Sequence, residues 1–329
     1  MSNRSLAAAP RSAKERPLVT PRQAAWCFAP LILAFVVQDR FTLAVLALAG
    51  VQAFFVASWD LLGGVSGQVS LGHALPFGTG AYAAMLLSGW SRWPPAAAVA
   101  GGALAGAAAA ALQGRLGAHL SRLSLALLTL ATAEAARELS GMLELTSQEG
   151  TLVGGEGGVP GVLFPWNEAT AARIIAAALA VGLIALLRVA RSNLGLAMRT
   201  VREDDRGAAA SGINVVRVRV AAFALAGGVA GLAGGFAAGL VGRATPSMLS
   251  LEASLFVLAA AGVGGLGTVI GPATAGYALT AVLQWLDLSG PVRLTIYAVL
   301  VIAVGLVAPE GVISIRGLGR WDRWRIRRA

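Results

Sequence analysis

Three polar side chains, Gln68, Ser70 and His73, stand in the stretch GQVSLGHALPFGTGAY, inside one of the most apolar regions of the sequence. Irregular backbone at membrane depth is tolerated where it is buried in protein or lines a watery cavity, and its free peptide groups can then bind a polar solute. One interpretation is therefore a segment of a solute path, formed by Gly67, Gln68, Ser70 and His73. The other is a tight turn in which Gln68 and Ser70 cap the next helix and His73 bonds to a neighbouring carbonyl. The length of the segment fits both interpretations.

A second glycine-rich interruption, AAGVGGLGTVIGPATAG, begins at Ala260. The 33 residues from Ser254 to Leu286 must supply two helices, so we expect a pair of discontinuous or tilted helices. The glycines of this break are further candidates for a solute path, and close packing between helices is the alternative interpretation. The candidates for the path are Gly264, Gly265 and Gly267.

The stretch from Arg191 to Val220 carries the densest group of charges in the middle of the chain. Its pattern predicts one or two short helices that end near Gly212. A three-to-four-residue spacing predicts that three arginines share one helix face, and the neighbouring acids suit exposed pairing with them. Such a helix could insert into a groove of a partner protein, and a solvated loop is the alternative. The arginines are Arg199, Arg202 and Arg206, and the acids are Glu203, Asp204 and Asp205.

The composition shows which elements must position these residues. Of the 329 residues 57% are hydrophobic and 13% are charged, which excludes an ordinary soluble domain. A helical crossing of a bilayer needs roughly 20 apolar residues, and ten segments qualify as candidates. We therefore expect an all-α, polytopic transmembrane bundle of about ten helices with glycine-rich discontinuous segments. The segments cover about 24–38, 41–58, 72–90, 95–112, 123–140, 170–189, 220–241, 254–269, 272–286 and 292–308.

The basic residues are distributed unevenly between the two sides of this bundle. If the N-terminus is cytoplasmic, 20 of the 26 basic residues fall on the cytoplasmic side, and the longest external loop, 141–169, has none. This positive-inside pattern predicts that both termini are cytoplasmic. We expect a basic tail (1–22), a transmembrane domain (23–312) with a cytoplasmic loop at 190–219, and a second basic tail (313–329). The net charge of +10 indicates contact with anionic lipid and not with nucleic acid.

Several classes of chemistry find no support in the sequence. Cys27 is the only cysteine, and no Cys/His cluster indicates a metal site. The chain has no G-x-x-x-x-G-K-[ST] phosphate loop, so any coupling to ATP must come from a partner. Among isolated charges, Asp60 is interpreted as lying at the cytoplasmic mouth with no special role. Arg137 is expected to pair with Glu134 and Glu138 and not to relay protons.

The opening motif and four further segments of the sequence together resemble one protein family. The motif LLGGVSGQVSLGHALPFGTGAYAAMLL resembles the G-x-x-G-Q-x-S-L-G-H-A-x-F-x-G-x-G-A-Y pattern of permease subunits of branched-chain amino-acid ABC transporters, of the LivM type in the LivH/LivM family. The other segments follow in the family's order, over roughly 40–317. They are GGEGGVPGV, LGLAMRTVREDDRGAAASGINV, GVGGLGTVIGPATAG and VAPEGVISIRG.

The resemblance implies a transport subunit of the bacterial inner membrane and not an enzyme. It implies a LivH-like second permease subunit, two cytoplasmic ATP-binding subunits that bind the ATP, and a periplasmic or extracellular solute-binding protein. Loop 190–219 would then couple the chain to the ATPases. Gly195 and Gly212 would shape this loop, and Arg199, Arg202, Glu203 and Asp204 would face the ATPase.

The solute and the energy source stay open at this stage. Branched-chain or related amino acids are the first expectation, and urea, short amides or aromatic acids are alternatives that family relatives carry. A stand-alone secondary transporter is the third hypothesis. It is disfavoured because we find no unpaired titratable group in the middle of a predicted crossing.

Overall fold

The computed structural model describes residues 21–146, 152–161, 167–286 and 290–307. The second predicted basic tail, at 313–329, and nearly all of the first, at 1–22, lie outside these residues. Everything below refers to the described part of the chain.

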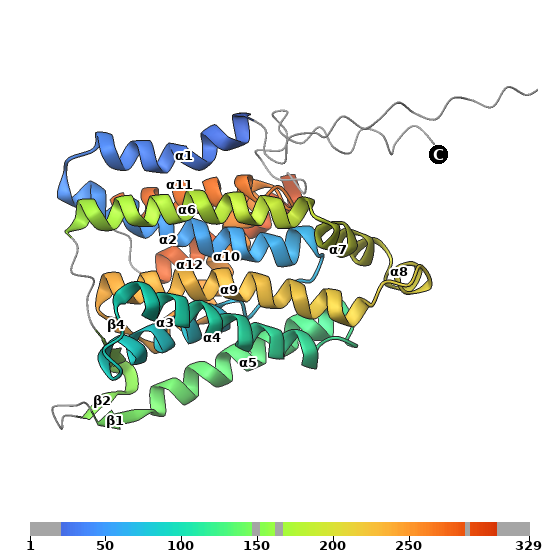
Figure 1. The fold of residues 1–329 in the computed structure, drawn as a ribbon, viewed down its shortest axis with the longest axis horizontal. Helices are drawn as coiled ribbons and strands as arrows, with labels where there is room; N and C mark the ends of the chain where they lie inside the picture. The colour runs from blue at the N-terminus through green and yellow to red at the C-terminus, as the bar shows by residue number, and fades with distance from the viewer. Residues whose placement is uncertain (1–20, 147–151, 162–166, 287–289, 308–329) are drawn as a thin grey trace, which may run out of the picture.

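Ten long helices lie side by side and form the body of the molecule (Figure 1). Each of the ten segments predicted as crossings corresponds to one of them, so the predicted all-α bundle is confirmed. The helices are α1 (Pro21–Val36), α2 (Arg40–Asp60), α3 (Ala74–Gly89), α4 (Pro95–Leu116), α5 (Arg122–Met142), α6 (Glu168–Arg191), α9 (Val215–Val241), α10 (Leu251–Gly264), α11 (Ile270–Trp285) and α12 (Gly290–Val307).

Four stretches of helix in the described part are long and apolar enough to cross a membrane on their own: Arg40–Val65, Pro95–Leu116, Glu168–Arg191 and Val215–Val241. The first of these is α2 together with one π-helical turn, η1 (Leu61–Val65). α10 is apolar but only 14 residues long, as expected from the short span available to α10 and α11.

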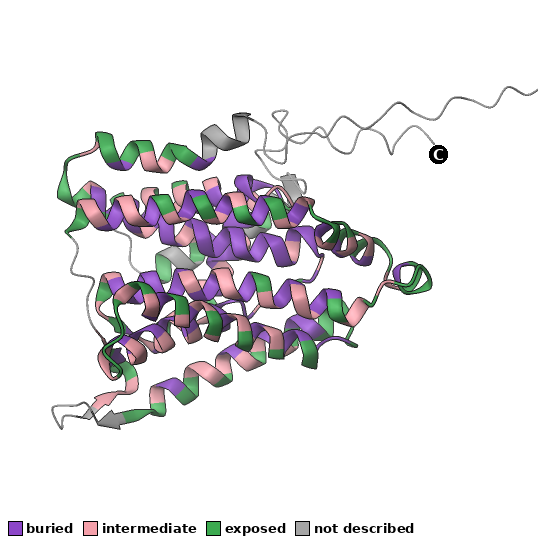
Figure 2. Cartoon of the chain, in the orientation of Figure 1, coloured by how far each residue is buried: buried purple, intermediate pink, exposed green. Residues whose placement is uncertain are grey.

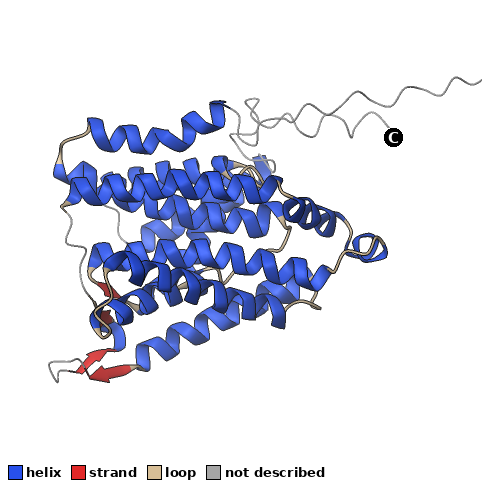
Figure 3. Cartoon of the chain, viewed as in Figure 1, coloured by secondary structure: helices blue, strands red, loops and turns tan. Residues whose placement is uncertain are grey.

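The two ends of the bundle differ in structure (Figure 3). Two short helices, α7 (Asn193–Glu203) and α8 (Asp205–Ala210), project at one end, which we call the α7 end (Figure 1). Short strands lie at the opposite end, which we call the strand end. These are β1 (Glu144–Thr146), β2 (Leu152–Gly154), β3 (Val159–Pro160) and β4 (Arg243–Ala244), together with the 3₁₀ turns η2 (Gly155–Gly157) and η3 (Pro246–Leu249).

Small residues allow the central helices to approach closely. A Cβ atom on Gly231 of α9 would lie 2.5 Å from the carbonyl oxygen of Gly102 in α4 and 2.9 Å from the Cα atom of Gly106. Such contacts replace the hydrophobic driving force that helices lack in lipid. α2 lies in the middle of the bundle, and nearly all of its second half is buried (Figure 2).

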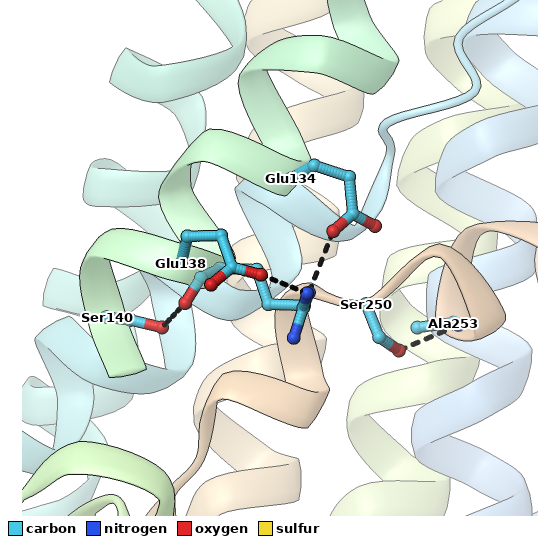
Figure 4. Close-up of polar contacts among 6 residues, drawn as sticks. Glu134, Glu138, Ser140, Ser250 and Ala253 are labelled. Carbon is cyan, nitrogen blue, oxygen red and sulfur yellow. Dashed lines mark hydrogen bonds and ion pairs between the residues drawn. The ribbon is translucent and has the colours of Figure 1, made fainter. Parts of the chain in front are cut away.

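The predicted ion pair on α5 is confirmed. Arg137 donates to Glu134 over 2.8 Å and also to Glu138 (Figure 4). The three side chains are neighbours on one helix, so each charge has a local partner.

Candidate functional site

The buried carboxylate of Asp60 joins the two glycine-rich breaks. Asp60 ends α2 and is fully buried, and its oxygens accept the backbone N–H groups of Gly267 at 2.6 Å and Val269 at 2.8 Å. These two residues belong to the turn between α10 and α11. The interpretation that gave Asp60 no special role was therefore wrong, because this carboxylate ties α2 to the start of α11.

The same turn contains an unusual backbone conformation. Val269 has φ of 63°, in the left-handed region that a β-branched residue rarely adopts. Strained residues of this kind persist where the surroundings fix them. Here the hydrogen bond to Asp60 and the burial of the Val269 side chain supply that constraint.

Arg202 of α7 reaches into the space between the two breaks. Its guanidinium donates to the carbonyl of Gly64 in η1, and its aliphatic stem covers Gly67. Gly67 has φ of 71°, and a Cβ atom there would lie 2.9 Å from the Arg202 Cβ, so both conformation and space require glycine. Arg202 Nη1 also lies 3.6 Å from the place that a Cβ on Gly267 would take. We call the set Asp60, Gly64, Gly67, Arg202 and Gly267 the junction.

α7 is amphipathic and lies against the junction with one face. Ser192 caps its N-terminus through the Gly195 N–H, and Gly195, Met198 and Val201 are buried. A side chain at Gly195 would collide with the carbonyl of Ala190, so this glycine permits the sharp bend from α6 into α7. The opposite face exposes Leu196, Arg199 and Glu203, spaced along the helix at intervals of three and four.

The prediction that Arg199, Arg202 and Arg206 share one helix face was wrong. Arg202 reaches the junction, whereas Arg199 lies on the exposed face of α7 and Arg206 belongs to α8. α7 ends at Glu203, and Asp204, in an extended conformation, accepts the N–H of Arg206 and begins α8. The hydrogen bond from the Arg206 N–H to the Asp204 side chain is favoured over continuation of α7, because aspartate side chains compete well for backbone N–H groups. The predicted end near Gly212 is confirmed, since α8 ends at Ala210.

Two arginines outside the predicted set hold α7 and α8 in place. Arg219 of α9 pairs with Asp205 and donates to the Ala118 carbonyl at 2.6 Å. Arg122 of α5 donates to the Arg202 carbonyl at 2.6 Å. In the sequence analysis both counted only toward the positive-inside pattern, because their partners are far away in the chain.

Two of the three polar residues of the opening motif have side-chain partners within the bundle, whereas the buried Ser70 hydroxyl has none among the described residues. His73 Nε2 lies 2.9 Å from the Ser58 hydroxyl, and the ring stacks on Phe55. Gln68 donates to Ser66 at 2.7 Å. Neither Gln68 nor Ser70 caps α3. Ser254 of α10 instead accepts the N–H of Ala74, the first residue of α3, and Thr129 of α5 accepts the N–H of Leu71 in the loop before it.

The transport-path assignment remains a prediction. Gly67 and Gln68 border a hollow of about 10 Å³, room for about one water molecule. Gly264 packs against the carbonyl of Gly271, and Gly265 has φ of 88° at the end of α10. In this conformation these residues therefore form helix ends and contacts between segments.

We expect the substitution Asp60→Asn to destabilise the protein. The two carboxylate oxygens accept one backbone N–H group each. The asparagine amide has a single oxygen, so its NH₂ group would face the second N–H donor. A buried donor without a partner costs about 1–3 kcal/mol. Thermal unfolding of the purified chain in detergent measures this loss.

Asp39→Asn is the matched control at the other end of α2. Asp39 is an exposed N-cap that accepts the Thr42 N–H at 2.8 Å, and Asn caps helices about as well as Asp. We expect little change in the melting temperature of this variant. Equal melting temperatures for both variants would contradict the role given to Asp60.

Comparison with known proteins agrees with this architecture. The family model described as the permease component of the branched-chain amino acid transport system matches residues 41–308. The high-affinity branched-chain amino acid transport system permease protein LivM of Salmonella typhimurium is 33% identical over 86 residues, which are 26% of this chain and 20% of that relative. The aligned part thus spans about a fifth of the curated relative. No solved structure matches the chain. Because the family model covers most of its length, the chain belongs to the family of branched-chain amino acid transport permeases and is a multi-pass membrane protein.

Proposed function

We propose that this chain is a membrane-spanning subunit of an ATP-binding cassette importer for branched-chain or related amino acids. The observation that carries the proposal is the placement of helix α7. One face of this helix is buried against the junction, while the other is exposed at the end of the bundle. A helix placed in this way can receive a force from a partner and pass it to the helices behind it.

The charge distribution supports a cytoplasmic α7 end. Basic residues at this end come from the loop 190–219 and from Arg115 and Arg122, at the end of α4 and the start of α5. The strand end carries Glu144, Glu156 and Glu168. Basic residues concentrate on the cytoplasmic side of membrane proteins. Both termini are then cytoplasmic and the short strands are external.

The exposed face of α7 has the chemistry of a protein contact. Leu196 is 66% exposed, and charged residues of both signs, Arg199 and Glu203, follow it on the same face at one and two turns along the helix. An apolar anchor with a polar rim is the usual composition of a binding surface. We assign this face to one of two partner ATP-binding subunits, which bind the ATP themselves.

The junction supports a route from that contact into the bundle. Arg202 attaches α7 to η1, which continues α2, and Asp60 attaches the end of α2 to the start of α11. A displacement of α7 therefore acts at the point where α2 and α11 are joined. A second permease subunit and an external solute-binding protein complete the proposed importer.

The transport test uses cells or vesicles that contain this chain with its proposed partners. We expect uptake of radiolabelled leucine, isoleucine and valine, and we expect it to vanish with a catalytically dead ATPase. Uptake that survives the dead ATPase would contradict an ATP-driven importer. Uptake of urea, a short amide or an aromatic acid in place of these amino acids would contradict the proposed substrate class.

We expect Leu196→Gln to weaken the contact with the ATP-binding subunits. Burial of a leucine side chain contributes about 1.5–3 kcal/mol, which corresponds to a loss of roughly tenfold or more in affinity. The measurement is the apparent affinity of the membrane complex for the ATP-binding subunits, with leucine uptake measured in parallel.

Leu116→Gln is the control for this variant. Leu116 ends α4 at the same end of the bundle and is 58% exposed, but it lies outside α7. We expect normal affinity and uptake in this variant. Normal affinity in the Leu196 variant as well would contradict the assignment of the α7 face.

A further inference from the structure

A cavity of about 220 Å³ opens between α2, α10, α11 and α12, on the side of the bundle toward the strand end. It is smaller than the about 300–1,000 Å³ of pockets for drug-sized ligands, so its size suits a small solute. Its walls come from the helices that the junction joins at the opposite end. The cavity therefore lies apart from the α7 surface and from the residues predicted as a transport path.

One part of the wall carries a single carboxylate. Glu252 lies in the first turn of α10 and lines the cavity together with the hydroxyls of Ser247 and Ser250. Ser250 caps the helix through the Ala253 N–H at 3.3 Å (Figure 4). No lysine or arginine contributes to the described lining. The wall thus offers one negative charge, hydroxyl groups and the positive end of a helix dipole within a few residues of each other.

A second polar group comes from the middle of the membrane-spanning part. Gln52 of α2 lines the cavity, and its side-chain oxygen is buried without a hydrogen-bond partner among the described residues. A buried amide oxygen without a hydrogen-bond partner destabilises the protein. Rotation of the Gln52 side-chain amide would turn this oxygen toward a donor group of a solute bound in the cavity. Thr280 of α11 also lines the cavity. Its hydroxyl donates to the Gly276 carbonyl at 2.8 Å, so the hydroxyl oxygen can still accept a hydrogen bond.

The rest of the wall is apolar. Leu48, Phe256 and Leu283 line it, and Phe256 is held edge-on against Tyr297 with 5.4 Å between ring centroids. A ligand that fills the cavity must therefore present a charged or polar part toward Glu252 and an apolar part toward these side chains.

We propose that this cavity binds a small zwitterion with an apolar side chain, namely a free α-amino acid, on its way through the membrane; this inference rests on the proposed function. Glu252 takes the ammonium group. The Ser250 hydroxyl and the first N–H groups of α10 take the carboxylate. Leu48, Phe256 and Leu283 contact the aliphatic side chain, and Gln52 and Thr280 contact the polar part as it moves inward.

Simpler solutes use only part of this wall. A lone cation would pair with Glu252 but would meet the positive end of α10. A lone carboxylate would suit the helix start but would be repelled by Glu252. A neutral amide would leave the Glu252 charge without a partner. Only a solute with both charges and an apolar side chain uses all three parts.

The test is thiol protection in the assembled transporter without its solute-binding protein. Ser247→Cys places a thiol at the exposed rim of the cavity, while the native Cys27 is buried. We expect millimolar leucine to slow modification by a membrane-impermeant thiol reagent at least threefold. We expect 3-methylbutylamine and 4-methylpentanoate, which lack one charge each, to give no protection. Equal modification rates with and without leucine, or protection by either analogue as strong as by leucine, would overturn the proposal.

The role of Glu252 is tested by a matched pair of variants in the Ser247→Cys background. Glu252→Gln should abolish protection by leucine, whereas Glu168→Gln should retain it. Glu168 also lies in the first turn of a helix at the strand end, α6, but does not line the cavity, so both variants lose a similar helix-dipole contact. Protection that survives Glu252→Gln would overturn the assignment of the ammonium group.

Leucine uptake by the wild-type transporter is measured in the same vesicles and separates the two proposals. Uptake without protection overturns the cavity assignment and leaves the importer intact. Protection without ATP-dependent uptake overturns the importer and leaves the cavity as an amino-acid site.

Discussion

The structure depends on one buried carboxylate. Asp60 stands at the end of the central helix, fully out of contact with solvent, and holds two backbone N–H groups of the turn before α11. A buried carboxylate is tolerated only when hydrogen bonds satisfy it, and these two bonds also fix a left-handed valine. This contact fixes the α10–α11 turn against the end of α2.

This constraint gives the two ends of the bundle different tasks. At the α7 end, Arg202 packs on Gly67 and bonds to Gly64, so α7 is attached directly to the joined ends of α2 and α11. Toward the strand end the same two helices stay packed together, with Gly276 of α11 against Val56 of α2 and the rings of Phe41 and Trp285 edge-on at 5.9 Å between centroids. With α10 and α12 they line the cavity that contains Gln52 and Thr280. A displacement at the junction can therefore pass along this packed pair of helices to the wall of the cavity. This arrangement is the basis of the coupling proposed here.

The sequence predicts the helices well because long apolar runs between charges and glycines leave few alternatives in a membrane. Each of the ten predicted segments is a helix, and the two glycine-rich breaks lie where the length of the chain required them. The charged loop between α6 and α9 also forms the expected short helices. These features follow from local patterns of hydrophobicity and backbone propensity.

The contacts of the site do not follow from such patterns. Asp60 and Gly267 are 207 residues apart, and Arg202 and Gly64 are 138 apart, so no local spacing relates them. The end of α7 was missed because Asp204 can cap a new helix as well as continue the old one. The partner of His73 was misassigned because several acceptors compete for a buried imidazole, and only packing decides among them. A charged residue within an apolar run was the one signal that could have marked Asp60.

The most direct test of the coupling is the accessibility of the cavity in two states of the ATPases. The rate of modification of Ser247→Cys is measured in the assembled transporter, first free of nucleotide and then with the ATPases trapped by ADP and vanadate. We expect trapping to change this rate several-fold, and we expect the change to be lost in Arg202→Ala. It should be kept in Arg115→Ala, because Arg115 is an exposed arginine of α4 at the same end of the bundle and lies outside α7. If the thiol is modified at the same rate in the nucleotide-free and the vanadate-trapped transporter with native Arg202, the proposed coupling is contradicted.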